Sequence, residues 1–163
     1  MGKVESKLNE MGIIVPDVPK PAASYIPAVQ TGNLIFTAGQ GCKKDGILVY
    51  KGKLGQELTV TEGYEAAKIS ITNCLAILKG HLGNLDKIRK IVKLLGFVAS
   101  APGFDQQPYV INEASELLIN VFGEKGKHAR SAIGVNELPF GTPVEIEMIV
   151  EIWQKEQFYF INL

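Results

Sequence analysis

Residues 59–83, TVTEGYEAAKISITNCLAILKGHLG, carry the clearest secondary-structure pattern of the sequence. Thr59 stands three residues before Glu62, which is the spacing of a capping box at the start of a helix. Apolar residues then recur at helical spacing, and Gly83 is typical of a helix end. The stretch therefore predicts a long helix with one buried face. Its apolar positions are Ala67, Ile71, Cys74, Leu75, Leu78 and Leu82.

On the N-terminal side of this helix, the sequence predicts a β-hairpin. Tyr25–Gln30 and Leu34–Ala38 are two β-prone runs, and Thr31-Gly32-Asn33 between them is a turn signal. We expect Gly39-Gln40-Gly41 to end the second strand. Residues 43–57 are polar and rich in glycine, which predicts a loop with a short extended piece.

On the C-terminal side, the sequence predicts three strands and a second helix. The first strand is Ile91–Ala99, with Gly96 as a bulge. The helix runs from about Pro108, a residue suited to a first helical turn, to Phe122. Ser131–Val135 and Val144–Trp153 follow as strands.

The order of elements decides the fold class. After a short N-terminal helix at residues 3–11, the order is β-β-α-β-α-β, which indicates an α+β fold with one sheet and both helices on one face. The 163 residues fit a single domain. We divide it into an N-terminal helical extension and lead-in (1–20), a core (21–153) and a C-terminal tail (154–163).

The last strand has two unlike faces. Its even-numbered residues from 144 to 152 are all apolar, as expected for a face packed on helices. The odd-numbered face mixes three glutamates with Ile149 and Trp153. This mixture predicts a partly buried face in an oligomer, with a carboxylate beside an interface cleft.

Composition excludes several classes of protein. The 17 Lys and Arg residues balance 17 Asp and Glu residues, so the formal net charge is zero. This balance provides no positive field for counterion release, which argues against a nucleic-acid coat protein. With 46% hydrophobic residues, the chain is also not intrinsically disordered.

The sequence also indicates a compartment. Cys42 and Cys74 are too few for the disulfide framework of a secreted domain, and residues 1–12 lack the apolar core of a signal peptide. Residues 21–42 carry no charge, but prolines and a glycine interrupt them, so they do not predict a spanning helix. We therefore expect a cytoplasmic protein that does not cross a membrane.

Few residues carry obvious chemistry. Arg130, in His128-Ala129-Arg130-Ser131, is suited to bind a small carboxylate bidentately, although a surface or salt-bridged arginine is favoured on this evidence alone. No cluster has metal-ligand spacing, so we predict no metal site. The basic residues at 79–93 allow an anion or RNA patch, but a solvated helix end is favoured.

Short motifs recur along the chain in an order shared with one protein family. The ordered set resembles the YjgF/RidA family, also called L-PSP endoribonuclease-like proteins, over about residues 20–153. The N-terminal helix and long loops are similar to a longer subgroup of that family. The motifs are Tyr25-Ile26-Pro27-Ala28-Val29, Gly32-Asn33-Leu34-Ile35-Phe36-Thr37-Ala38-Gly39-Gln40, Asn112, Ala129-Arg130-Ser131, Leu138-Pro139 and Val144-Glu145-Ile146-Glu147.

The resemblance implies a chorismate-mutase-like fold that assembles as a homotrimer with clefts between subunits. Well-studied members hydrolyse reactive enamines and imines, such as 2-aminoacrylate, to a keto acid and ammonia without a cofactor. Carried over, Arg130 would hold a substrate carboxylate, Glu145 would orient water and move a proton, and Tyr25 would close the pocket or relay a proton. We also expect Glu145 to stay ionised beside Arg130. The implied substrate-binding positions are Gly39, Asn112 and Ala132.

The sequence departs from the family pattern at three positions. Ala38 stands in place of a frequent serine, Ala132 of a frequent cysteine and Gly134 of a frequent acid. The cysteine position mainly offers backbone contacts, whereas the other two changes remove polar groups. We therefore expect a different or bulkier substrate, or weak catalysis.

Three functions remain open on the sequence. The leading one is hydrolytic deamination of imines or enamines. The second is a non-catalytic trimer that binds a small carboxylate metabolite. The third is the ribonuclease activity in the family name, against which the zero net charge and the lack of a catalytic histidine pair argue.

Overall fold

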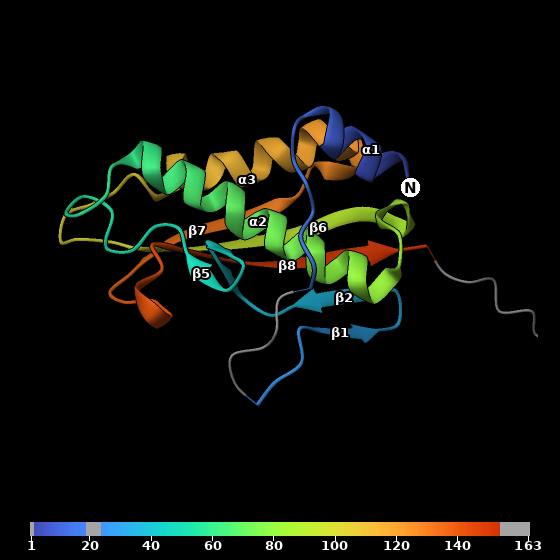
Figure 1. Cartoon of the computed structure of the whole chain (residues 1–163), viewed down its shortest axis with the longest axis horizontal. Helices are drawn as coiled ribbons and strands as arrows, with labels where there is room; N and C mark the ends of the chain where they lie inside the picture. The colour runs from blue at the N-terminus through green and yellow to red at the C-terminus, as the bar shows by residue number, and fades with distance from the viewer. Residues whose placement is uncertain (1, 19–23, 154–163) are drawn as a thin grey trace, which may run out of the picture.

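A computed structural model describes residues 2–18 and 24–153; the predicted tail, 154–163, and part of the lead-in lie outside them. Two long helices cover one face of a mixed sheet, which is the predicted α+β arrangement (Figure 1). The helices are α1 (Lys3–Glu10), α2 (Val60–Leu82) and α3 (Gln107–Phe122), with short 3-10 turns η1 (Leu85–Lys87), η2 (Gly123–Gly126) and η3 (Pro139–Gly141). The strands are β1 (Ala28–Thr31), β2 (Leu34–Thr37), β3 (Gln40–Gly41), β4 (Lys43–Lys44), β5 (Ile47–Leu48), β6 (Ile88–Ala99), β7 (Ala129–Val135) and β8 (Val144–Ile152).

Helix α2 begins and ends as its sequence predicts. The amide of Glu62 donates to Thr59 Oγ1 at 3.3 Å, and the amide of Thr59 donates to Glu62 Oε2 at 2.8 Å. At the other end, Gly83 adopts a left-handed φ of 77° and its amide donates to the carbonyl of Lys79. Helix α3 likewise matches its predicted ends to within one residue.

The six-stranded sheet has the order β1-β2-β8-β6-β7, with β3 also paired to β8. Strands β6 and β7 are parallel because α3 carries the chain back across the sheet between them. The other pairs in this sheet are antiparallel, including the predicted β1–β2 hairpin with Gly32 in its turn. Strand β7 therefore forms one edge of the sheet and β1 the other.

Gly96 is not the bulge that its sequence predicts. The register shifts of β6 lie earlier in the strand, within Ile88–Lys93. A Cβ at residue 96 would lie 2.6 Å from Cδ1 of Ile111 in α3. The glycine therefore allows α3 to pack closely against β6.

The segment 39–57 is more structured than predicted. Gln40 and Gly41 form β3, a strand paired with β8, rather than the end of β2. Strands β4 and β5 form a separate two-stranded sheet, with Asp45 and Gly46 at positive φ in its turn. The one predicted sheet is therefore accompanied by a small second one.

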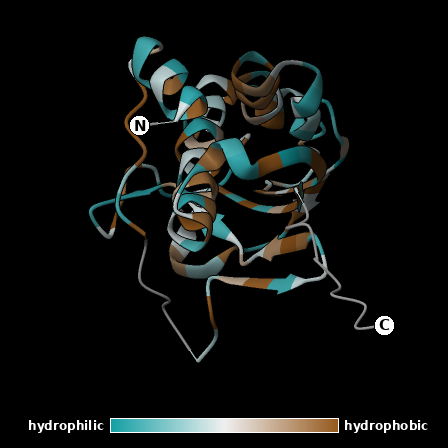
Figure 2. Cartoon of the chain, turned by 90° about the vertical axis from the view of Figure 1, so that its right-hand side faces the viewer, coloured by the Kyte–Doolittle hydropathy of each residue, from teal (hydrophilic) through white to brown (hydrophobic). Residues whose placement is uncertain are grey.

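The core lies between the helices and the even-numbered face of β8. Val144, Ile146, Met148 and Val150 are each at most 1% exposed, whereas the odd-numbered residues are only partly buried, so the predicted division of this strand is confirmed. Figure 2 shows the hydrophobic segments concentrated in the sheet and the helices above it. Cys74 of α2 is also buried, as predicted.

Helix α1 is attached through a carboxylate that lies far away in sequence. Oδ2 of Asp86 accepts from the amide of Lys3 at 2.8 Å, and Oδ1 accepts from the amide of Val4 at 2.9 Å. Leu8 of the same helix is fully buried. The N-terminal helix is thus fixed to the turn before β6. Across residues 2–18 and 24–153, we find no helix with the length and apolarity needed to span a membrane.

Candidate functional site

The structure separates the six predicted site residues into two groups of three. The first group, which lines one pocket, is Tyr25, Gly39 and Glu145. The second group lies at the β7 edge of the sheet and on α3, and consists of Asn112, Arg130 and Ala132.

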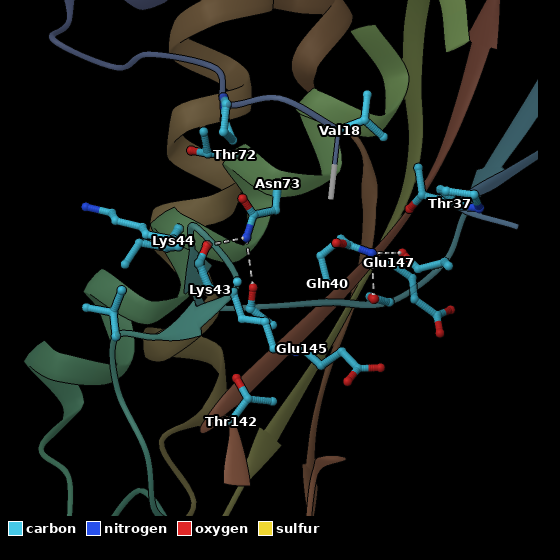
Figure 3. A pocket seen from close by; sticks show the side chains of 18 of the residues that line it. Val18, Thr37, Gln40, Lys43, Lys44, Thr72, Asn73, Thr142, Glu145 and Glu147 are labelled. Carbon is cyan, nitrogen blue, oxygen red and sulfur yellow. Dashed lines mark hydrogen bonds between the residues drawn. The ribbon is translucent and has the colours of Figure 1, made fainter. Parts of the chain in front are cut away.

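The pocket is a broad depression with a volume of about 1790 Å³. The β1–β2 hairpin, the segment from Thr37 to Asp45, the N-terminal lead-in and one side of α2 surround it. Glu145 and Glu147 point into it from β8, while Asn73 approaches from α2 (Figure 3). Its β8 side is therefore acidic, and Tyr25 stands largely exposed at its border.

The carboxylate of Glu145 lies directly against the backbone of Gly39. A Cβ at residue 39 would lie 2.8 Å from Cδ of Glu145 and even closer to its Oε1. A larger residue at this position would displace the carboxylate. Gly39 is therefore a point of close approach, and the approaching group is the protein's own Glu145.

Burial and one neighbouring carboxylate act on the acid–base behaviour of Glu145. Burial raises its pKa above the ordinary glutamate value, and the charge of Glu147 raises it further. Glu147 lies two residues further along the same strand and so on the same face. A carboxylate with a raised pKa is suited to accept and return a proton closer to neutral pH.

Arg130 and Glu145 lie on opposite faces of the sheet. In the register of β6, Leu94 pairs with Arg130, whereas Phe97 pairs with Glu145. Paired residues share a face and successive residues alternate, so positions 94 and 97 face opposite ways. Within one chain, the expectation that Arg130 keeps Glu145 ionised is therefore wrong.

Arg130 is held by α3 through three hydrogen bonds. Its Nη1 donates to Oδ1 of Asn112 at 2.9 Å and to Oγ of Ser115 at 3.2 Å, and its Nη2 donates to the carbonyl oxygen of Pro108 at 3.3 Å. Asn112, which the family resemblance gives as a substrate-binding position, is thus a direct hydrogen-bond partner of this arginine. The three acceptors fix the plane of the guanidinium against the helix.

Two donors of Arg130 have no partner within the described part of the chain. A guanidinium has five N–H groups, and the three contacts leave Nε–H and one hydrogen of Nη2. These donors lie on neighbouring nitrogens, a geometry that matches a carboxylate. Partial burial lowers the pKa of Arg130, but the group stays charged at neutral pH.

The two small residues that follow on the same face of β7 have identifiable neighbours. Ala132 pairs with Gly96 under α3. A Cβ at Gly134 would lie 2.6 Å from Nε2 of Gln107, whose amide also donates to the carbonyl of Phe104 at 2.7 Å. The amide of Gln107 therefore takes the space beside Gly134, where other family members frequently carry an acid.

Sequence reasoning missed the residues that support these groups. Asn73 of α2 donates to the carbonyls of Gly41 and Lys43 and so fixes the segment after Gly39. The available signal was a polar residue within the apolar run of α2. Ser115, which accepts from Arg130, and His128, which contacts Ser115, were also missed, because no local pattern relates α3 to the turn before β7.

Other charged groups have structural partners. Nζ of Lys87 donates to the carbonyl of Leu82 at 2.6 Å, which supports the interpretation of the basic segment as a helix end, and Arg89 pairs with Glu151. No group of three His, Cys, Asp or Glu side chains suited to hold a metal ion occurs among the residues that the structure describes.

Comparisons with known proteins agree with this architecture. The sequence matches, over residues 5–152, the family described as "YjgF/chorismate_mutase-like, putative endoribonuclease". A protein of unknown function from Agrobacterium tumefaciens has a crystal structure with a TM-score of 0.87 and 42% identity, covering 92% of each chain. The fold and site thus define a protein of the chorismate-mutase-like YjgF fold. The chain belongs to the YjgF/RidA family.

Two curated relatives match most of the chain. Protein TCP17 from Trypanosoma cruzi is 42% identical over 152 residues, which cover 93% of this chain and 95% of the relative. A 2-iminobutanoate/2-iminopropanoate deaminase from Dermatophagoides farinae is 29% identical over 140 residues, or 86% of this chain and 94% of its own.

Proposed function

We propose that this protein hydrolyses small 2-imino acids, and their enamine tautomers, to 2-keto acids and ammonia. The observation that carries the proposal is the position of Arg130. Hydrogen bonds to α3 fix its guanidinium, which retains two adjacent N–H donors for a carboxylate. The raised pKa of Glu145 supplies the acid–base group such a reaction needs. The name of the deaminase relative supports the same substrate class.

We further propose that the two groups of site residues meet between subunits of a homotrimer. Within one chain they lie on opposite faces of the sheet, so a second copy must bring a β7 edge to the Glu145 pocket. The helix-free face of the sheet supports such an assembly because it exposes large apolar side chains, with Phe36 at 40% and Ile133 at 47%. The subunits would then enclose each cleft.

In the proposed reaction, Arg130 of one subunit binds the substrate carboxylate and orients the C=N carbon towards the pocket of the next. The imine reacts in its protonated form. Glu145 accepts a proton from water as the water oxygen bonds to the imine carbon, which gives a carbinolamine, and then passes this proton to the nitrogen. As the C–N bond breaks, the hydroxyl proton passes to Glu145, the keto group forms and ammonia takes that proton to leave as ammonium. In this proposal, Tyr25 closes the pocket or relays a proton.

The departures from the family pattern bear on the choice of substrate. Ala38 lines the pocket without a hydroxyl, and Gly134 faces the amide of Gln107 instead of providing a carboxylate. Fewer charged groups are then available to bind a polar substrate side chain. We therefore propose that the preferred imino acids carry an apolar side chain larger than that of 2-aminoacrylate.

The experiment that tests the function measures release of keto acid. A serine or threonine dehydratase generates the reactive intermediate, and the keto acid is followed with and without the protein. We expect acceleration by the wild type and loss of about 100-fold in Arg130→Ala, since a bidentate, charge-assisted pair is removed. The matched control is Arg89→Ala, which removes a surface arginine paired with Glu151.

The outcomes separate catalysis from binding alone. Equal rates with wild type and Arg130→Ala contradict the proposal. Thermal stabilisation of the wild type by pyruvate that depends on Arg130, without any acceleration of imine loss, identifies a carboxylate-binding protein that is not a deaminase.

A further inference from the structure

The pair Ser115 and His128 lies directly behind Arg130 and has no part in the reaction proposed above. Oγ of Ser115, which accepts from Arg130, lies 3.0 Å from Nε2 of His128. The other ring nitrogen, Nδ1, lies 2.6 Å from the carbonyl oxygen of Gly126. A continuous chain of hydrogen bonds thus connects the backbone of η2 with the guanidinium.

Chemistry fixes the direction of each bond in this chain. A guanidinium only donates, so Oγ of Ser115 accepts from Arg130. A carbonyl only accepts, so Nδ1 of His128 carries a proton and donates to Gly126. In the neutral ring, Nε2 then has a lone pair and accepts the hydroxyl hydrogen of Ser115. Donation from Ser115 to Nε2 therefore requires that His128 is neutral.

The far end of the chain of bonds is fixed by backbone packing. Gly126 is buried, and a Cβ at this position would lie 2.7 Å from the carbonyl carbon of Leu118. The glycine therefore lets η2 close against α3. This closure holds the carbonyl of Gly126 in line with His128.

The surroundings of His128 favour its neutral form. Burial lowers its pKa, the hydrogen bond to Gly126 acts in the opposite direction, and the charge of Arg130 on β7 lowers the pKa further. On η2 and just after it, Lys127 pairs with Glu124 at 2.7 Å with both side chains mostly exposed. From α3, the group that faces the ring is the uncharged hydroxyl of Ser115.

We propose that His128 is a positioning residue for Arg130 and makes carboxylate binding sensitive to pH. The neutral ring orients the hydroxyl of Ser115, which holds the guanidinium at the angle that presents its remaining donors. Protonation turns Nε2 into a donor, so the hydroxyl hydrogen of Ser115 loses its acceptor and the hydroxyl has to reorient. It also adds a like charge beside the guanidinium. The inference rests on the proposed function only in taking Arg130 as the carboxylate-binding group.

The test measures pyruvate binding to the assembled full-length protein by titration calorimetry in steps from pH 7.5 down to pH 4.5, because the pKa of His128 lies below its ordinary value. His128→Phe keeps the ring but has no nitrogen. His128→Gln offers an amide oxygen to Ser115 but does not titrate. The matched control is His81→Gln, because the exposed His81 on α2 contacts only Gln30, at 3.2 Å, within the described residues.

We expect His128→Phe to weaken pyruvate binding at pH 7.5 by about two- to tenfold, which is the net effect of one hydrogen bond. His128→Gln and His81→Gln should bind like the wild type at this pH. As the pH is lowered to 4.5, the wild type and His81→Gln should bind pyruvate more weakly, whereas the affinity of His128→Gln should change less. Ser115→Ala combined with His128→Phe should be no weaker than either alone, since both break the same chain of bonds.

Wild-type affinity in His128→Phe, or the same pH dependence in His128→Gln as in the wild type, overturns the inference. If His128→Phe does not fold, the pH dependence of pyruvate affinity in the wild type and in His128→Gln still tests the inference. In turnover assays, the expected pattern is a rise in KM that exceeds the fall in kcat. Should imine hydrolysis be absent while the pattern of pyruvate affinities holds, the deaminase proposal fails and the role of His128 stands.

Discussion

Nη1 of Arg130 on the edge strand donates to Oδ1 of Asn112 on α3 at 2.9 Å, so a neutral helix side chain holds the cation in place. A neutral acceptor orients a guanidinium without neutralising it, which leaves its charge available to a ligand. An acidic residue at position 112 would bind the arginine more tightly but would compete with any incoming carboxylate.

This relationship predicts opposite effects on stability and on binding. Asn112→Asp should raise the melting temperature slightly, because it creates a partly buried ion pair with Arg130, yet weaken pyruvate binding by more than tenfold. Asn112→Ala should weaken binding by only about two- to tenfold. Calorimetric titration with pyruvate and thermal unfolding measure both quantities. Wild-type affinity in Asn112→Asp contradicts the role of Arg130 as the carboxylate-binding group.

The raised pKa of Glu145 predicts how activity depends on pH. If ionised Glu145 accepts the proton from water, the rate rises as the pH rises through its pKa, at a pH above the ordinary glutamate value. Glu147→Gln removes a like charge and should shift this rise to lower pH. Glu145→Gln should abolish it together with most of the activity. Profiles of kcat/KM between pH 4.5 and 8 provide the measurement. If the rise occurs at the same pH in Glu147→Gln as in the wild type, the acid–base role assigned to Glu145 is contradicted.

The elements that depend on local chemistry could be predicted from the sequence. Capping of α2 by Thr59 and Glu62, the turn at Gly32 and the alternation along β8 each involve neighbours in the chain, so their patterns are local. The family motifs also singled out Arg130 and Glu145, but the sequence prediction placed the two side by side. Their positions on opposite faces depend on how β6 pairs with β7 and β8.

Other features could not be predicted because they depend on contacts between distant segments. In sequence, Gly96 resembles a bulge residue. The structure shows instead that a glycine is needed there because Ile111, 15 residues further on, packs against its backbone. The position of Arg130 depends on the hydrogen bond between Ser115, which lies on α3, and His128, which lies in the turn before β7. A single sequence contains no signal for such a meeting.

The contact between Gly39 and Glu145 predicts a specific coupling. Gly39→Ala should remove most of the activity but lower the melting temperature only modestly, since the new methyl group displaces the flexible carboxylate of Glu145. In a Glu145→Ala background, the same change should cost much less stability, because the obstructing side chain is gone. Thermal unfolding of the four proteins at one fixed concentration gives the coupling energy. An equal loss of stability on Gly39→Ala in both backgrounds contradicts the close approach of the Glu145 carboxylate to Gly39.

The attachment of α1 predicts a pH-dependent contribution to stability. The hydrogen bond from the amide of Val4 is the main cause of the lowered pKa of Asp86, and the amide of Lys3 contributes as well. Because the folded-state pKa is below the unfolded one, the stabilisation is complete above about pH 4. It is lost as the pH falls through the folded-state value.

Asp86→Asn should therefore lower stability by about 1 kcal/mol at pH 7, a typical cost of losing a helix cap. The difference from the wild type should shrink towards pH 2.5. Asp45→Asn, in the exposed β4–β5 turn, is the matched control and should have little effect at either pH. Urea unfolding at both pH values tests this, and an Asp86→Asn deficit that persists at pH 2.5 contradicts the electrostatic part of the account.

The packing of α3 on β6 predicts a compensating pair of substitutions in the core. A methyl group at residue 96 would lie 2.6 to 2.9 Å from three carbon atoms of Ile111, so Gly96→Ala should destabilise by about 1–3 kcal/mol through overpacking. Ile111→Ala removes a fully buried side chain and should cost about 2–5 kcal/mol by leaving a cavity. In the double variant, the alanine methyl at position 96 enters that cavity, so the combined loss should be clearly smaller than the sum. Urea unfolding at one protein concentration measures all four free energies, and strictly additive losses would show that Gly96 is required for a reason other than this contact.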